Sequence, residues 1–242
     1  MRDILLYFSV YYNGDWDKIY KAIENKEEVD HLELQKLKER LKGSYITILD
    51  EEYPRALKEI LKPPFVIYYE GDINLLKSKE NLWLFGSYMT DNFKSIVKEE
   101  VHIAKDNIVA GYTTDFEIDL VNNINGAKLI LVKDSGIDSS LGIKKEHSRE
   151  LAKKGNLIIT EYPGHVIPCF NNWVNSNRIK VGITKGIYLI NSLKERITFQ
   201  CISETLAEGK EVYCYNKNID KKSHNGKLIS KGAISIASME EI

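Results

Sequence analysis

The sequence has few cysteines, no long apolar run and no excess of either charge. Cys169, Cys201 and Cys214 are too few and too widely spaced for a disulfide framework or a zinc cluster. No stretch approaches the ~18 apolar residues that span a bilayer. Residues 1–17 also lack the small-residue cleavage site of a signal peptide. We therefore expect a cytoplasmic protein without a membrane partner.

The formal net charge is −1, so charge decides neither for nor against nucleic acid. A strongly basic chain would indicate nucleic acid directly, but a near-neutral chain can still bind it through a local basic patch. The histidines are scattered, and none pairs with another at metal-ligand spacing. They are His31, His102, His147, His165 and His224. The sequence therefore predicts no metal site and no cofactor.

The chain of 242 residues is long enough for one large α/β domain and a small additional module. The module is predicted at residues 1–43, where apolar residues recur at helical spacing and Gly43 follows the last of them. These apolar residues are Trp16, Ile19, Tyr20, Ile23, Leu34, Leu37 and Leu41. The helical module is too short to bury a good core alone.

Residues 44–242 alternate between short apolar strands and amphipathic helices. The predicted strands lie at 45–49, 65–69, 82–85, 107–110, 127–132, 157–160, 186–190, 211–215 and 233–237. Such alternation with short connections favours an α/β fold with a mostly parallel, doubly wound sheet. The strands are nearly all apolar, as burial on both faces of a parallel sheet requires.

Four turns follow strands of the predicted sheet, where an open α/β sheet binds its ligands. They lie at 86–88, 111–114, 134–136 and 161–178. In the first, Gly86 permits a close backbone approach, Ser87 offers a hydroxyl, and the following helix offers unpaired N–H groups to an anion. The signal is weak by itself, because neither G-x-G-x-x-G nor G-K-[ST] occurs.

The last of these turns leads into a polar helix that carries a tryptophan. Trp173 is surrounded by asparagines, Asn177 among them, and Arg178 follows. The ring could stack on a nucleobase while the amides and the guanidinium contact a backbone. The alternative is that Trp173 packs on the sheet and the asparagines cap the helix. The residues alone leave both interpretations open.

Catalytic patterns are weak in this sequence. No G-x-S-x-G nucleophile elbow occurs. Asp115, Glu117 and Asp119 form an acidic cluster after Gly111, but no histidine or second acidic cluster accompanies them as metal ligands. A solvated helix start is the favoured interpretation, because acidic side chains stabilise that end of a helix. We expect a protein that is not an enzyme.

Several short motifs occur in one order along the chain. They are Tyr53-Pro54, Pro63-Pro64, Tyr68-Tyr69-Glu70-Gly71, Phe85-Gly86-Ser87, Val109-Ala110-Gly111, Glu161-Tyr162-Pro163-Gly164 and Trp173–Ile183. In this order they resemble the DNA-processing protein A (DprA/Smf) family of bacteria. The resemblance covers residues 45–242, and more loosely the helical module.

The resemblance implies an extended Rossmann-like domain at 44–242 behind a small SAM-like helical module at 1–43. Members of this family bind single-stranded DNA, usually as homodimers, and help to load the recombinase RecA during DNA uptake, with no established catalytic step. The residues that match the family's motifs, together with Lys180, make up the predicted DNA-binding site. They are Gly86, Ser87, Gly111, Trp173, Asn177, Arg178 and Lys180.

The chain departs from the family at two cationic positions. Tyr88 and Ser176 stand where the family has arginines. Each lost phosphate contact removes part of the counterion-release free energy, so we expect weaker and less salt-dependent DNA binding. Lys180 and the lysine-rich segment after Asn216 are candidates to compensate.

Two further functions are compatible with the sequence. Related Rossmann-like domains bind or hydrolyse small nucleotides, so a nucleotide sensor or hydrolase is the main alternative. The P-G-G-x-G-T loop of such phosphoribohydrolases is absent from this chain. The other alternative is a structural relative that acts only through protein contacts.

Overall fold

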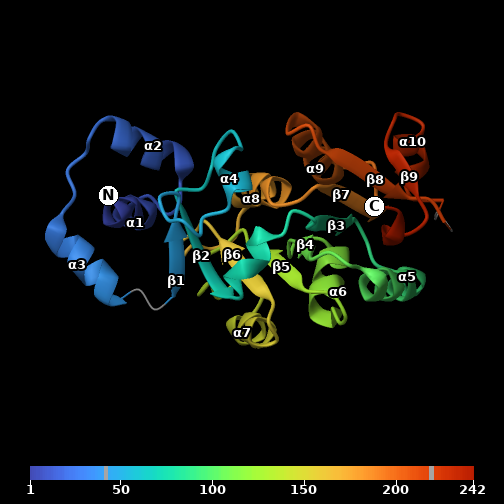
Figure 1. The fold of residues 1–242 in the computed structure, drawn as a ribbon, viewed down its shortest axis with the longest axis horizontal. Coiled ribbons are helices and arrows are strands. Elements are labelled where there is room, and N and C mark those ends of the chain that lie inside the picture. Colours follow the sequence, from blue (N-terminus) through green and yellow to red (C-terminus); the bar gives the residue numbers. More distant parts are fainter. Residues whose placement is uncertain (41–42, 218–220) are drawn as a thin grey trace. The chain divides into compact units, whose positions relative to one another are not determined.

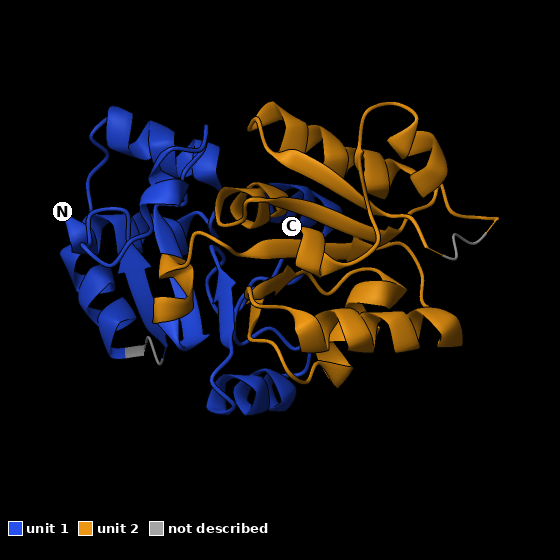
Figure 2. Cartoon of the chain, turned by 45° about the vertical axis from the view of Figure 1, so that its right-hand side comes forward, with its two compact units in different colours: residues 1–73, 133–176 blue, residues 74–132, 177–242 orange. Residues whose placement is uncertain are grey.

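The computed structural model describes residues 1–40, 43–217 and 221–242 (Figure 1). Leu41, the last apolar residue of the predicted helical module, lies outside these residues. The chain divides into two compact units (Figure 2). Unit 1 comprises Met1–Ile73 and Lys133–Ser176, and unit 2 comprises Asn74–Val132 and Asn177–Ile242.

Unit 1 contains three strands and the N-terminal helices α1 to α4, together with α7 and part of α8. The strands are β1 (Ser44–Thr47), β2 (Val66–Gly71) and β6 (Leu157–Thr160). The helices are α1 (Arg2–Tyr11), α2 (Trp16–Glu24), α3 (His31–Arg40), α4 (Arg55–Lys58), α7 (Lys145–Lys153) and the first part of α8 (Phe170–Gly182). Strand β2 pairs antiparallel with both β1 and β6, so the sheet is mixed rather than wholly parallel.

The helical module has an aromatic core that it does not complete alone. Tyr7 and Phe8 of α1 and Ile19 of α2 are buried together, and Phe65, which precedes β2, packs against them. Trp16 stacks on Phe65 at 5.3 Å between ring centroids. Its Nε1 donates to the carbonyl oxygen of Pro63 at 2.7 Å. Residues after the module thus supply the burial that a short helical segment lacks.

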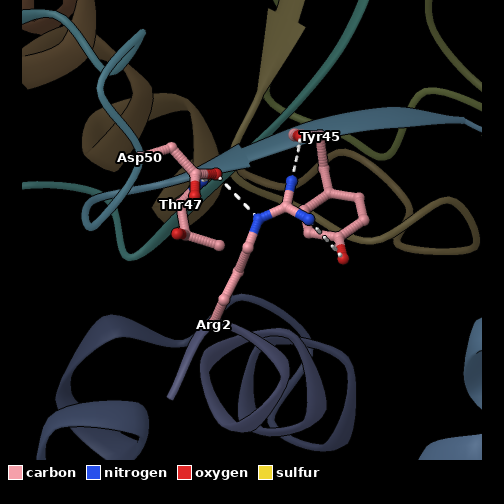
Figure 3. A network of polar contacts seen from close by, with 4 residues as sticks. All are labelled: Arg2, Tyr45, Thr47 and Asp50. Carbon is pink, nitrogen blue, oxygen red and sulfur yellow. Dashed lines mark hydrogen bonds and ion pairs between the residues drawn. The ribbon is translucent and has the colours of Figure 1, made fainter.

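A polar network also joins α1 to the β1 region (Figure 3). The Nε of Arg2 donates to Asp50 at 2.9 Å, and its guanidinium carbon lies 4.4 Å from the ring centroid of Tyr45. The same Asp50 carboxylate accepts the backbone N–H of Thr47 at 2.8 Å. Burial alone would raise the pKa of Asp50, but the Thr47 N–H and the Arg2 guanidinium hold it below its ordinary value.

Unit 2 is built on six strands in the order β5-β4-β3-β7-β8-β9. They are β3 (Leu82–Gly86), β4 (Ile108–Ala110), β5 (Leu129–Val132), β7 (Gly186–Asn191), β8 (Glu211–Tyr215) and β9 (Ile234–Ile236). Every neighbouring pair among them is parallel. The predicted α/β fold with a mostly parallel sheet is therefore confirmed.

Helices and short 3₁₀ segments precede, connect and follow these strands. They are η1 (Ile73–Lys77), α5 (Asp91–Ile103), α6 (Asp115–Asn123), the last part of α8, α9 (Arg196–Ala207), α10 (Asn225–Ile229) and η2 (Met239–Glu241). The central strands are buried along their whole length, with Trp83 of β3 and Tyr188 of β7 fully covered. Apolar runs of this kind form the strands because both sheet faces are covered.

The described residues include no helix long and apolar enough to cross a membrane. The three cysteines are free, and they differ in exposure. Cys169, in the segment before α8, is exposed, whereas Cys201 and Cys214 are buried. Burial raises the pKa of the Cys214 thiol to about 12.

Candidate functional site

The turn after β3 holds the first two predicted site residues. A Cβ on Gly86 would lie 2.4 Å from the Phe116 ring of α6, so glycine is required here by an internal side chain. The Thr114 hydroxyl donates to the carbonyl oxygen of Gly86 at 2.8 Å. The sequence motif predicts a glycine here for the close approach of a ligand, whereas the close neighbour in the structure is the Phe116 ring.

The backbone N–H groups of this turn also have internal partners. Ser87 and Tyr88 both donate their N–H to Oδ1 of Asn191, at 3.0 and 3.2 Å, and Asn191 Nδ2 donates to the Tyr88 carbonyl oxygen at 2.8 Å. The Ser87 hydroxyl lies 3.1 Å from that of Thr198 and accepts the Leu193 N–H at 3.0 Å. These two N–H groups therefore already share an acceptor, and a role of the turn in DNA binding stays a prediction.

The turn after β4 is closed by a carboxylate. Glu117 is fully buried and accepts the N–H groups of Gly111, Thr113 and Thr114 at 3.0, 3.1 and 3.3 Å. Thr114 and Glu117 form a capping box at the start of α6. The predicted helix start is thus present, but the solvated interpretation is wrong for Glu117, whose carboxylate occupies the place that an anion would take. Asp115 remains exposed.

Lys180 lies beside this carboxylate in the interior. Its side chain is only 1% exposed, and its Nζ is 4.9 Å from the ring centroid of Trp83. A Cβ on Gly111 would come within 2.8 Å of Glu117 Oε1 and 2.9 Å of Lys180 Nζ, so both charged groups crowd the same side of that glycine. Lys180 is therefore an internal counter-charge here and does not face solvent.

The turn after β5 is closed by a cation. Lys133, in unit 1, is buried and donates from Nζ to the carbonyl oxygens of Gly136 and Ile137, at 2.8 and 3.1 Å. Burial lowers the pKa of its ammonium group to about 8. A Cβ on Gly136 would strike the Pro163 carbonyl oxygen, so the turn packs directly on the loop after β6.

Trp173, in the unit 1 part of α8, is 3% exposed. Its ring lies 5.6 Å from that of Phe170, which is itself exposed. A base needs an uncovered ring face to stack on, so the packed interpretation of Trp173 describes this structure and the stacking interpretation does not. Ser176, at one of the lost arginine positions, is also buried and donates its hydroxyl to the Trp173 carbonyl oxygen at 2.8 Å.

Asn177 and Arg178 lie, like Lys180, in the unit 2 part of α8. Asn177 is fully buried, and Arg178 is half-buried. Burial raises the pKa of the Glu204 carboxyl on α9, while the Gln200 amide at 2.7 Å and the charges of Lys180 and Arg178 act against that rise. Arg178 is thus the cation of the predicted set that combines partial exposure with a neighbouring carboxylate.

Two features of these turns were not predicted from the sequence: the acceptor role of Asn191 and the burial of Glu117. The Glu204 carboxyl beside Arg178 was not predicted either. Only Glu117 had a local signal, because Thr114-x-x-Glu117 is the pattern of a capping box. Within residues 1–40, 43–217 and 221–242, no three His, Cys, Asp or Glu side chains are grouped so as to hold a metal ion.

The parallel sheet and its glycine turns define an α/β protein of the Rossmann-like class. Solved structures share this fold. The structure of DNA processing protein A from Streptococcus pneumoniae matches with a TM-score of 0.74 at 22% identity, covering 99% of this chain and 91% of that one. DNA processing protein A from Helicobacter pylori matches with a TM-score of 0.69 at 18% identity, covering 83% and 94%.

Sequence comparison defines the family. Residues 44–242 match the DNA recombination-mediator protein A family, and the chain belongs to it. DNA processing protein DprA of Bacillus subtilis is 27% identical over 210 residues, which cover 81% of this chain and 69% of the relative. Protein Smf of Escherichia coli is 26% identical over 209 residues, covering 79% and 54%. The resemblance found in the sequence motifs is thereby confirmed, for a divergent member.

Proposed function

We propose that the protein binds single-stranded DNA as a recombination mediator in the cytoplasm, without a catalytic step. The observation that carries this proposal is the family match over residues 44–242. The related Helicobacter pylori protein is described by its single-stranded DNA binding mode. Assembly as a homodimer and loading of RecA are the finer parts of the proposal, by the resemblance to the same family.

The predicted site residues take different parts in this proposal. Arg178 is the group that pairs with a DNA phosphate, because it is a partly exposed cation. Asn177, Lys180 and Trp173 are buried, so we assign them no direct contact with DNA. Gly86, Ser87 and Gly111 shape the strand ends and do not donate to the ligand, since their turns are closed internally.

Fluorescence anisotropy with labelled oligo-dT tests the proposal. We expect binding at low salt that weakens as salt rises, and Arg178→Ala should reduce the slope of log K against log salt by about 0.7. Arg55→Ala is the matched control, because Arg55 is a highly exposed arginine on α4 in unit 1. Absence of binding by the unmodified protein at low salt would overturn the proposal.

The nucleotide alternative meets a specific obstacle at the turn after β4. Three backbone N–H groups that could hold a phosphate are bonded to Glu117. Thermal-shift measurements with nucleotides separate the two functions, because a ligand at 100 times its dissociation constant adds about 2.7 kcal/mol of stability. We expect no such shift with mononucleotides.

A further inference from the structure

The ends of β7 and β8 are tied to α10 by one buried amide. Asn225 is 1% exposed, and its Nδ2 donates to the carbonyl oxygens of Leu189, Ile190 and Tyr215 at 3.0, 3.2 and 3.2 Å. Its Oδ1 accepts the Ser192 hydroxyl at 2.6 Å. The position of α10 at the carboxyl end of the parallel sheet is thus fixed by four hydrogen bonds.

Two rings lie at this fixed strand end. His224 immediately precedes α10, and its backbone N–H donates to the Ser192 carbonyl oxygen at 2.6 Å. Phe199 of α9 meets the His224 ring edge to face, with 6.0 Å between centroids. Phe199 is 42% exposed although it is a large apolar side chain. A packed histidine therefore supports an aromatic ring that remains open to solvent.

The charge around these rings is strongly positive. The segments 192–199 and 221–232 together contain six cationic side chains and a single acidic one, Glu195, in a chain whose formal net charge is −1. Lys194, Lys227 and Lys231 are all exposed. Lys227 lies in α10, which begins directly after His224, and Lys231 follows the end of that helix, where its backbone N–H donates to the Leu228 carbonyl oxygen at 3.0 Å. Lys194 lies two residues after Ser192, whose carbonyl oxygen accepts the backbone N–H of His224. Partial burial and the charges of these three lysines lower the pKa of the His224 imidazole.

We propose that Phe199, His224, Lys194, Lys227 and Lys231 form a contact surface for single-stranded DNA, which we call the Phe199 patch. An exposed aromatic ring within a cluster of lysines suits an unpaired base that stacks while its phosphates meet the cations. A duplex offers no free base face to the ring, so single-stranded DNA is the fitting partner. The inference rests on the proposed function and adds a surface that Arg178 does not belong to.

Equilibrium binding of labelled oligo-dT to the full chain tests the patch. Phe199→Ala should weaken binding about tenfold, since stacking on one aromatic ring contributes about 1–3 kcal/mol. Leu206→Ala is its control, because Leu206 is an apolar residue exposed on the same helix. The Lys227→Ala/Lys231→Ala double variant should reduce the salt slope by about 1.4, or about 0.7 per lysine.

The control for the lysines is the Lys98→Ala/Lys105→Ala double variant, which removes two exposed lysines of unit 2 away from the two patch segments. It should leave the salt slope unchanged. The patch is wrong if the protein binds DNA and Phe199→Ala and the patch lysine variant both behave like their controls. Failure of the proposed function is a different result, namely no binding by the unmodified protein, and it overturns the patch as well.

Discussion

The turns after β3 and β4 are closed by two different kinds of group. Asn191 closes the first with a neutral amide, and Glu117 closes the second with a carboxylate beside buried Lys180. A buried amide needs only its hydrogen bonds, whereas a buried carboxylate also needs a matching charge. Two adjacent strand ends are thus closed by hydrogen bonds to internal side chains while depending on different forces.

Removal of the Glu117 carboxylate, which closes the turn after β4, should lower the free energy of unfolding the most. Glu117→Ala leaves three N–H groups without their acceptor and Lys180 without the adjacent carboxylate. Breaking one side of a buried charge pair costs about 3–5 kcal/mol, so urea unfolding should show a loss of that size. Asp115→Ala, at an exposed acid of the same helix turn, should change stability by less than about 0.5 kcal/mol. Equal effects of the two substitutions would contradict the comparison.

Removal of the Asn191 amide, which closes the turn after β3, should lower the free energy of unfolding somewhat less. Asn191→Ala deprives Ser87 and Tyr88 of a shared acceptor and the Tyr88 carbonyl of its donor. Each buried polar group left unsatisfied costs about 1–3 kcal/mol, and partial hydration of this half-buried turn should limit the loss to about 3 kcal/mol. Denaturant unfolding at low and high salt sharpens the contrast. We expect Asn191→Ala to lower the free energy of unfolding by the same amount at low and at high salt. A strong salt dependence of this loss would contradict a turn closed by an uncharged amide.

The alternation of strands and helices was enough to predict the fold, because strands covered on both faces leave continuous apolar runs. The side chains that close the turns, Asn191 and Glu117, could not be predicted in the same way. Asn191 lies 104 positions after Ser87 and reaches it only through the β3–β7 pairing. The burial of Glu117 could not be predicted, because acidic side chains at helix starts are usually solvated. The local capping-box pattern does not show that the neighbouring strand end is buried. For Trp173, the sequence could not decide between packing in the interior and stacking on a base, because its neighbours in sequence are polar.

The turn after β5 extends the comparison to a cation. The pKa of Lys133 is lowered to about 8, so the folded protein binds fewer protons than the unfolded chain between that pH and about 10.5. Stability from this group therefore rises with pH across that window, by at most about 3 kcal/mol. Unfolding free energies measured from pH 7.5 to 10.5 should show the rise, and Lys133→Met should remove it. A variant that keeps the full pH dependence would assign it to other groups.

The smallest effect is expected at the surface. The Arg2–Asp50 pair joins α1 to the β1 region with side chains that are 47% and 17% exposed. Exposed ion pairs contribute about 0–1 kcal/mol, so Arg2→Ala should lower the unfolding free energy by less than about 1 kcal/mol. Arg2→Lys keeps the charge but loses most of the forked contact with Tyr45, and thermal unfolding of the two variants separates charge from geometry.

Cys169 gives the chain a natural position for a spectroscopic label. Its thiol is exposed, while the thiols of Cys201 and Cys214 are buried and their pKa values are raised by that burial. Because thiolates react and buried thiols remain protonated, a maleimide dye would attach at one place without any cysteine substitution. The Cys169 carbonyl oxygen accepts the Trp173 N–H at 3.0 Å, so that dye would report on the first turn of α8.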